Sequence, residues 1–108
     1  MAKYHNKKTI VCGITFDSKA ESSRYMELSA MERSGKISGL KLQERFKIAD
    51  SCIIHGRKRA ARYYVADFVY TRDGEQIIED VKGAVTPMYS LKRHLMKSVL
   101  GLDILETF

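Results

Sequence analysis

The segment VYTRDGEQIIEDVKG, residues 69–83, constrains the fold of this chain more than any other stretch. At its centre lies Asp73-Gly74, a dipeptide that prefers the type I′ turn of a two-residue β-hairpin loop. Branched apolar residues flank the turn on both sides, as strands favour. A two-residue loop sets the pairing by counting, so Val69 should lie opposite Ile78. The segment therefore predicts a β-hairpin whose register follows from its turn.

The same count brings two aspartates together. Asp67 falls directly opposite Asp80, and Lys82 follows on the same face because side chains alternate along a strand. Like charges in directly opposed positions destabilise a strand pair, and an unpaired carboxylate between apolar neighbours is costly. Lys82 can neutralise only one of the two acids. A further positive charge is therefore expected, and Mg²⁺ is a candidate because one or two carboxylates commonly hold it.

Other interpretations of the acidic pair stay open. Arg24 or Arg62 could pair with the aspartates as a plain salt-bridge cluster, or the face could simply be solvated. A three-residue loop would also shift the register by one position and move the two acids to opposite faces.

The remaining patterns predict one domain over residues 1–108, with a flexible basic arm at residues 1–8. The predicted elements are a short strand pair at 9–16, a helix within 17–35, strands at 40–49, 61–72 and 75–83, a basic loop at 55–60, a helix within 86–101 and a closing strand at 102–108. This order, β-β-α-β-β-β-α-β, is typical of an α/β fold in which a mixed β-sheet is flanked by two helices.

One further carboxylate lies on the first predicted helix. Ala20, Leu28 and Met31 form its apolar stripe on a 3.6-residue period, and Glu21 lies at the edge of that stripe. Glu21 could therefore reach the sheet surface. Alternatively, its carboxylate completes a capping box with Ser18, which would leave it less free to bind a metal ion.

The second predicted helix carries a lysine inside its apolar stripe. Met88, Leu91, Leu95 and Val99 form the stripe, and Lys92 falls among them rather than on the opposite side. Lys92 either points toward the acidic pair or packs its stem against apolar residues while its amine reaches water.

The chain is basic, with a net charge of +6 and a pI near 9.4. A surplus of this size in a small domain favours an anionic partner, nucleic acid first, although a generic solubilising surface is the alternative. The residues expected to contact DNA phosphates are Lys7, Lys8, Arg57, Lys58, Arg59, Arg62, Lys92, Arg93 and Lys97. On the second helix, Arg93 and Lys97 are also explained by a solvated basic face.

The two cysteines and the apolar segments suggest an intracellular protein. Cys12 and Cys52 lie far apart without the spacing of metal ligands, which suits free thiols in a reducing compartment. No apolar run approaches the length of a membrane span. We therefore expect no membrane partner and a cytoplasmic location.

Several of these positions resemble a known pattern. In chain order, Glu21, Asp67 and the triplet Asp80-Val81-Lys82 match the helix acid, the strand aspartate and the acid-x-lysine of the PD-(D/E)xK nuclease superfamily. The stretches GITFDSKAESSRYMEL, LKLQERFKI, YVADFVY and IEDVKG resemble a family of small phage-encoded proteins. That family is usually placed beside Holliday-junction resolvases of the phage endonuclease I type. The resemblance spans roughly residues 4–107.

The resemblance implies a restriction-endonuclease-like fold and a Mg²⁺-dependent DNA endonuclease, with Mn²⁺ as a substitute. Asp67, Asp80 and the main-chain carbonyl of Val81 would hold the metal ion, which would activate water and neutralise charge on the phosphate. Glu21 would help to bind a second ion or position water. Lys82 would orient the attacking water or stabilise the transition state.

The resemblance also implies a substrate and an assembly. Branched DNA in the cytoplasm of a phage-infected or prophage-carrying bacterium is expected, with cleavage by a homodimer because two sites must face two strands. Ala66 stands where the superfamily pattern has proline, and Asp80 where glutamate is commoner, and neither change removes a ligand. The alternatives are a non-catalytic nucleic-acid-binding protein on the same fold, and a nicking or duplex nuclease in phage replication or packaging.

Overall fold

The computed structural model describes residues 8–108 of the chain. Within this range the elements are β1 (Thr9–Val11), β2 (Ile14–Phe16), α2 (Lys19–Arg33), β3 (Ser38–Ala49), β4 (Cys52–Ile54), β5 (Arg57–Arg59), β6 (Arg62–Arg72), β7 (Glu75–Val81), α3 (Pro87–Leu100) and β8 (Leu105–Thr107). Most of the predicted basic arm at residues 1–8, including Lys7, lies outside the described residues.

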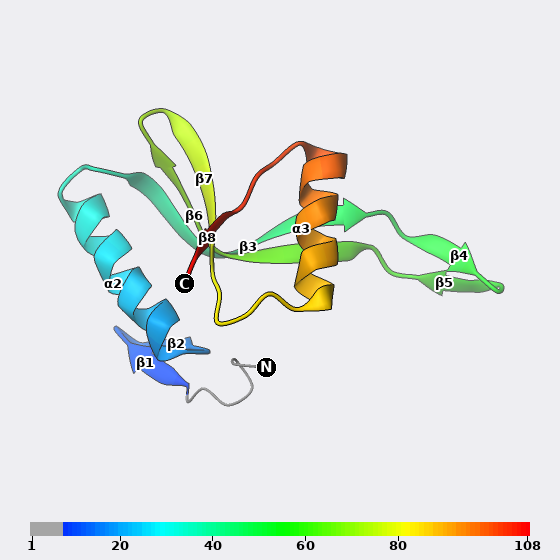
Figure 1. The fold of residues 1–108 in the computed structure, drawn as a ribbon, viewed down its shortest axis with the longest axis horizontal. Coiled ribbons are helices and arrows are strands. Elements are labelled where there is room, and N and C mark those ends of the chain that lie inside the picture. The colour runs from blue at the N-terminus through cyan, green and yellow to red at the C-terminus, as the bar shows by residue number, and fades with distance from the viewer. Residues whose placement is uncertain (1–7) are drawn as a thin grey trace.

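The predicted α/β fold with a mixed sheet and two helices is confirmed (Figure 1). The main sheet has the strand order β3-β6-β7-β8. Its first three strands pair antiparallel, and β8 adds in parallel to β7. The strands β1 and β2 form a separate antiparallel pair beside α2, as the sequence predicts. No helix among residues 8–108 is long and apolar enough to cross a membrane.

The hairpin of β6 and β7 has the predicted register. Val69 pairs with Ile78, and the pairs continue to Arg72 and Glu75 on either side of the turn. Asp73 and its glycine neighbour have φ values of 52° and 78°. Positive φ at both central residues is what a type I′ turn requires.

Both helices begin and end at the predicted residues. Ser18 caps α2 by accepting a hydrogen bond from the Glu21 backbone N–H at 3.1 Å. Thr86 caps α3 in the same way, Pro87 occupies the first turn, and Gly101 ends the helix in the left-handed conformation. Only glycine takes that conformation without steric cost, so the end of α3 is encoded locally.

The two helices cover opposite faces of the sheet, because neighbouring residues near the hairpin turn, such as Phe68 and Val69, belong to different core clusters. The cluster under α3 contains Ile48, Tyr64, Ala66, Val69, Ile78, Tyr89 and Met96. The cluster under α2 contains Phe16, Leu28, Ile37, Phe68, Tyr70 and Val81. The hairpin is therefore buried on both sides, and acids on either face have to be accommodated inside the protein.

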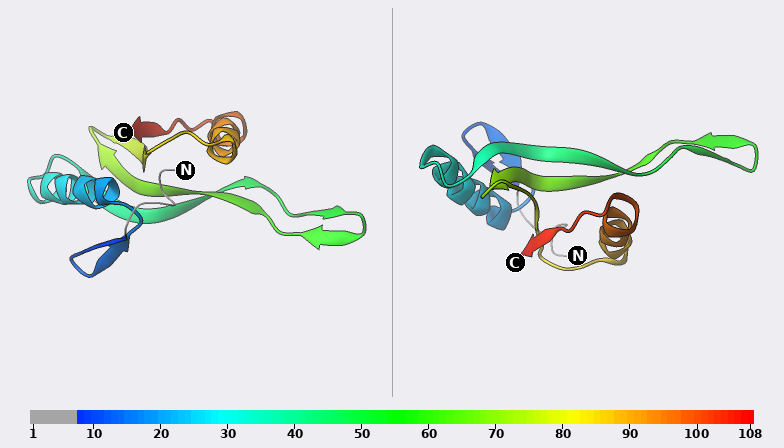
Figure 2. Two further views of the ribbon diagram at one scale, coloured as in Figure 1. Left: turned by 60° about the horizontal axis from the view of Figure 1, so that its bottom comes forward. Right: turned by 90° about the horizontal axis from the view of Figure 1, so that it is seen from above.

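The predicted basic loop at 55–60 is wrong, because β4 and β5 form a hairpin there. Cys52–Ile54 pairs with Arg57–Arg59 around a two-residue turn at His55-Gly56, where both residues have positive φ. This hairpin prolongs β3 and β6 beyond the sheet (Figures 1 and 2). The radius of gyration is 15.5 Å, whereas a compact domain of this length has about 13 Å. The projecting ribbon accounts for the elongated shape.

The predicted apolar stripe of α3 is wrong except at Leu95, which is partly buried and packs against the core cluster under α3. Met88 is 61% exposed, Leu91 and Val99 are exposed too, and the residues that α3 buries are Tyr89 and Met96. The helix is rotated because Tyr89 packs under it and directs its hydroxyl to a carboxylate of β8. Hydropathy alone ranks leucine and methionine above tyrosine and therefore misses this orientation.

Candidate active site

The two aspartates lie where β6 and β7 part. The pairs of this ladder end at Phe68 and Glu79, one pair short of the predicted contact between Asp67 and Asp80. Instead, the Val81 backbone N–H donates a hydrogen bond to Asp67 Oδ2 at 2.9 Å. Asp67 Oδ2 thus accepts from a β7 backbone N–H just beyond the last pair of the ladder. The prediction of direct opposition is therefore corrected to a side-chain bridge between the strands.

Both aspartates and Lys82 line one pocket of about 430 Å³. The pocket lies between this end of the hairpin and the start of α3. Its other lining residues are Tyr64, Val65, Thr86, Pro87, Met88, Tyr89 and Lys92. The structure thus gathers two predicted carboxylates and two predicted lysines at one pocket, with Lys92 among its lining residues.

Asp80 is held on both of its oxygens by different kinds of partner. Asp80 is 2% exposed, and the Tyr64 hydroxyl donates a hydrogen bond to its Oδ2 at 2.5 Å. Lys82 Nζ lies 3.1 Å from Oδ1, which is an ion-pair distance. The contact between Lys82 Nζ and Oδ1 does not have the angles of a hydrogen bond. Asp80 Oδ1 therefore accepts no hydrogen bond from the described residues. One buried oxygen of Asp80 therefore keeps acceptor capacity toward the pocket.

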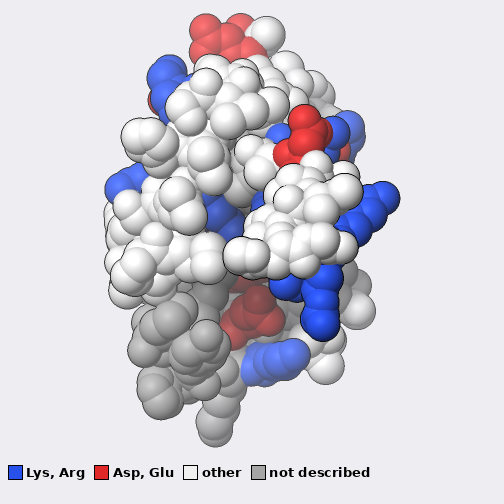
Figure 3. Space-filling view, turned by 90° about the vertical axis from the view of Figure 1, so that its right-hand side faces the viewer, with Lys and Arg blue, Asp and Glu red and all other residues white. Residues whose placement is uncertain are grey.

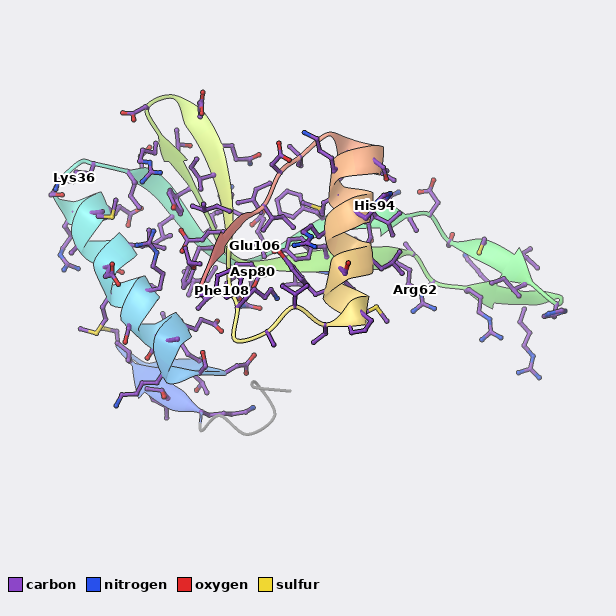
Figure 4. All side chains as sticks on the ribbon, in the orientation of Figure 1. Lys36, Arg62, Asp80, His94, Glu106 and Phe108 are labelled. Atoms are coloured by element: carbon purple, nitrogen blue, oxygen red, sulfur yellow. The ribbon has the colours of Figure 1, made fainter. Side chains whose placement is uncertain are left out.

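Lys82 is positioned by an aromatic ring as well as by Asp80. Its Nζ lies 3.7 Å from the centroid of the Tyr89 ring, a cation–π contact. The Tyr89 hydroxyl in turn donates a hydrogen bond to Glu106, which also forms an ion pair with Arg93 at 2.9 Å. Figure 4 shows Asp80 and Glu106 close together, consistent with their pairing across β7 and β8. Neither Tyr89 nor Glu106 carries a sequence signal for this role.

The two tyrosines of the pocket stay protonated well above neutral pH. Burial raises the pKa of Tyr64, and the neighbouring Asp80 carboxylate raises that pKa further. Burial likewise raises the pKa of Tyr89, followed by its hydrogen bond to Glu106. Both hydroxyls therefore act as fixed donors that orient carboxylates, rather than as bases.

Glu79, on the opposite face from Asp80, has a complete set of donors. Arg24 binds it with Nε at 2.6 Å and Nη2 at 3.0 Å, and the Tyr70 hydroxyl donates at 2.6 Å. Thr107 Oγ1 lies 3.3 Å away. The hydrogen bond to Glu79 raises the pKa of Arg24, and burial raises the pKa of Tyr70 to about 12.

These contacts bear on the alternative interpretation of the acidic pair. The carboxylate partners of Arg24 are Glu79 and, at 3.3 Å, Glu27 on its own helix. Arg24 therefore does not neutralise the two aspartates of the pocket. Among the described residues, Lys82 forms an ion pair with Asp80.

Glu21 occupies a different cavity from the two aspartates. It is buried, whereas Ala20, predicted in the apolar stripe of α2, is exposed. The cavity has a volume of about 260 Å³, and its lining residues are Ile14, Thr15, Phe16, Asp17, Glu21, Leu42 and Gln43. No group of three or more His, Cys, Asp or Glu side chains among residues 8–108 is arranged to hold a metal ion. The third predicted carboxylate is thus not gathered with the other two.

Gln43 lies between these two sites in the sheet. The pairs that flank it join Leu42 to Phe68 and Glu44 to Ala66, so Gln43 faces Asp67 across β3 and β6. Its φ of 55° is left-handed, which is uncommon for a residue other than glycine. Outliers of this kind gather at functional sites, and the sequence alone shows no sign of it.

The predicted DNA-binding residues among residues 8–108 are dispersed, because β1 and β5 lie far apart (Figure 1). Lys8 is exposed beside β1, Arg57, Lys58 and Arg59 form the exposed strand β5, and Arg62 begins β6. Arg93 is partly engaged by Glu106, and Lys97 pairs with Asp103 at 2.9 Å on the surface. Figure 3 views the end from which the ribbon projects and shows basic side chains around a recessed acidic patch.

Comparison with known proteins gives one match. The family model described as "Protein of unknown function (DUF1064)" matches residues 1–100, a span that contains both aspartates, Lys82 and all of α3. The search of curated proteins found no match. The search of solved structures also found none.

Proposed function

The chain belongs to the DUF1064 family, and we propose that it is a metal-dependent DNA endonuclease of the PD-(D/E)xK type. The proposed substrate is branched DNA such as a Holliday junction, cut by a homodimer in the cytoplasm of a phage-infected bacterium. The observation that carries the proposal is the pocket that Asp67, Asp80 and Lys82 share. Two acids and an amine at one open pocket are the groups that phosphodiester hydrolysis requires.

The donor set of this pocket fits a hard divalent cation. Asp67 and Asp80 offer carboxylate oxygens, and Oδ1 of Asp80 is buried without a hydrogen bond. Mg²⁺ is commonly held by one or two carboxylates, with water and substrate phosphate completing its shell, and Mn²⁺ accepts similar ligands. The Val81 carbonyl would be the third ligand in the proposal. Glu21, in its separate cavity, is assigned to the surroundings of the site.

The residues around the pocket would have separate roles in hydrolysis. A metal ion bound there would lower the pKa of a water molecule and neutralise charge on the phosphate. Lys82, held between Asp80 and the Tyr89 ring, presents a positive charge to the phosphate oxygens, where negative charge develops in the transition state. Tyr64 fixes the orientation of Asp80 by occupying its Oδ2.

Cations outside the pocket would hold the DNA backbone. Lys92 lines the pocket wall on α3, and the basic strand β5 with Arg62 extends the positive surface away from it. Such contacts release counterions, so binding should weaken steeply as salt rises. The acids are recessed and the cations project, which suits a polyanion that must approach a metal site.

Cleavage assays test the proposal. The protein is incubated with Mg²⁺ or Mn²⁺ and either a synthetic four-way junction or a linear duplex. Cutting of the junction alone supports the resolvase, and cutting of both supports the nicking or duplex nuclease. Asp67→Asn and Lys82→Ala should abolish cleavage while junction binding persists. Glu75→Gln, an exposed acid at the hairpin turn, is the matched control and should cut normally.

One observation favours a non-catalytic nucleic-acid-binding protein as the second candidate. Asp67 accepts a hydrogen bond from Val81, and Asp80 contacts both Tyr64 and Lys82, so each acid has a partner within the protein. In this case the acids would join the ends of β6 and β7. Binding without cutting in both metals, together with a large loss of stability in Asp80→Asn, would support this function over the nuclease.

A further inference from the structure

The β4–β5 hairpin, residues 52–59, is called the arm from here on. Every residue from 50 to 60 is exposed, so neither face of the arm packs against the rest of the described chain. Ile53 is 74% exposed, and Ile54 is exposed as well. Figures 1 and 2 show the arm projecting beyond both helices. Two adjacent isoleucines at the end of a bare ribbon need a partner to bury them.

The geometry of the arm is well defined despite its exposure. The pairs Ile53 with Lys58 and Ile54 with Arg57 enclose the turn at His55-Gly56. The φ values of these turn residues are 50° and 75°, as a type I′ turn requires. An isolated two-stranded hairpin is marginal in water, but this one continues the long pair of β3 and β6. The arm therefore presents its side chains in fixed positions.

The charge of the arm and its base indicates the chemistry of the partner. Residues 45–62 contain six basic residues and one acid, which are Arg45, Lys47, Arg57, Lys58, Arg59 and Arg62, and Asp50. The single acid is paired with Lys47 at 2.7 Å. None of the ion pairs among residues 8–108 involves the three cations of β5. Those three charges are available to an anionic partner.

Each face of the arm combines one isoleucine with at least one cation. Residues paired across two strands point to the same side, so Ile53 shares a face with Lys58, and Ile54 shares the other with Arg57. Duplex DNA offers phosphates for the cations and apolar sugar and base edges for the isoleucines. A second copy of the chain fits less well, because it would bring another basic arm against this one.

We propose that the arm binds duplex DNA, with the cations of β5 on phosphates and the two isoleucines against the walls of a groove. The inference rests on the proposed DNA partner and deepens it. The pocket would act on one segment of the substrate while the arm holds another. A branched substrate offers such separate duplex segments.

The first test compares two charge-matched triple variants. One is Arg57→Ala, Lys58→Ala and Arg59→Ala in the arm, and the other is Arg33→Ala, Lys36→Ala and Lys41→Ala at exposed positions outside it. Figure 4 shows Lys36 at the end of the molecule opposite the arm. The Kd for duplex and junction is measured by fluorescence anisotropy without a divalent metal, over a range of salt concentrations.

The arm triple should bind at least about tenfold more weakly, and its logarithmic salt slope should be smaller by about 2 to 3, since roughly 0.9 is lost per phosphate contact. The control triple should match the unmodified protein within about twofold, because it removes charge but no contact. Equal weakening by both triples would mean that net charge alone matters and would overturn the proposal.

The second test addresses the isoleucines. Ile53→Ser with Ile54→Ser should weaken DNA binding about fivefold and leave the salt slope unchanged, since apolar contacts release no counterions. Analytical ultracentrifugation of the same variant should show an unchanged mass. A dimer that dissociates in this variant while DNA affinity is retained would assign the arm to a second copy instead.

Binding and cutting are measured separately so that the two proposals can fail independently. Arm-dependent DNA binding by a protein that cuts nothing would leave the arm proposal standing and remove the nuclease. Normal cutting and binding by the arm triple would remove the arm and leave the nuclease.

Discussion

Glu79 and Asp80 are neighbours in the sequence, yet they occupy chemically opposite environments. Glu79 is 0% exposed and receives hydrogen bonds from Arg24 and the Tyr70 hydroxyl on the α2 side of the sheet. Asp80 is almost as buried, but it lies on the wall of an open pocket. Its Oδ1 has a lysine nearby and no hydrogen bond.

The difference shows that burial alone does not separate a structural acid from a candidate catalytic one. A buried carboxylate that is fully hydrogen-bonded contributes to the fold, and removing it leaves its donors unsatisfied. A buried carboxylate with spare acceptor capacity, facing a cavity, is available to a ligand. Because consecutive strand residues point to opposite faces, one dipeptide can hold one acid of each kind.

The largest expected effect is on cleavage by Asp80→Asn. If the proposed function is right, the rate with Mg²⁺ falls at least about a thousandfold, or 4 kcal/mol or more in the barrier, because the amide cannot replace a carboxylate ligand. The melting temperature should change by only a few degrees. A junction-cleavage assay and a thermal melt of the same preparation measure both. Normal cleavage by this variant would place Asp80 with Glu79 as a structural acid.

The second effect is on stability, from Glu79→Ala. Removing the carboxylate leaves Arg24 and the Tyr70 hydroxyl without their acceptor, which should cost about 3 kcal/mol. This is the low end of the usual range, because the Arg24 side chain keeps some contact with water. Urea unfolding measures the loss. Glu27→Ala, which breaks only the exposed contact of the same arginine, should cost about 0.5 kcal/mol or less.

The third effect is a loss of stability at alkaline pH. The pKa of Tyr70 is raised to about 12, so the folded protein holds this proton more tightly than the unfolded chain, whose tyrosines titrate near the ordinary value of about 10. The stabilisation is complete below pH 10 and is lost as the pH rises from about 10 to 12, by about 3 kcal/mol. Urea titrations across this range should show a flatter decline for Tyr70→Phe, which starts from a lower stability. Parallel curves would show that Glu79 does not depend on this donor.

The smallest effect concerns the ring beneath Lys82. Tyr89→Leu removes the cation–π contact and should slow cleavage about tenfold, close to the 1 to 2 kcal/mol that such contacts contribute. Tyr89→Phe keeps the ring and loses only the hydroxyl bond to Glu106, so it should cut within about threefold of the unmodified protein. Equal loss in both variants would mean that the hydroxyl bond to Glu106, rather than the ring, supports cleavage.

Much of the fold follows from local chemistry. The Asp73-Gly74 turn and the caps of both helices are each set by a few adjacent residues, and all lie where the sequence predicts. Periodicity does not predict the arm, because His55-Gly56 is a less familiar turn pair and its flanks, CII and RKR, do not alternate. Turn geometry with positive φ at two residues, not hydropathy, forms that hairpin.

The candidate site was predictable in part. Counting along the hairpin placed Asp67, Asp80 and Lys82 on a common face, and they share a pocket. The partners Tyr64 and Tyr89 reach the site only through tertiary packing, so no spacing rule encodes them. The ladder ends before Asp67, and the Asp67 side chain accepts the Val81 backbone N–H there instead. A contact of this kind between a side chain and a distant backbone group lies beyond periodicity.

The left-handed backbone at Gln43 has a consequence for laboratory evolution. A left-handed backbone destabilises the folded state by about 1 kcal/mol or more for any residue other than glycine, asparagine or aspartate. The strand that faces Asp67 therefore contains a small backbone strain at Gln43. A library selected only for heat resistance should therefore converge on glycine or asparagine at position 43. A library selected for turnover should keep glutamine if its amide takes part in the reaction. Comparing the two libraries would show whether position 43 only tolerates glutamine or needs its side chain for activity.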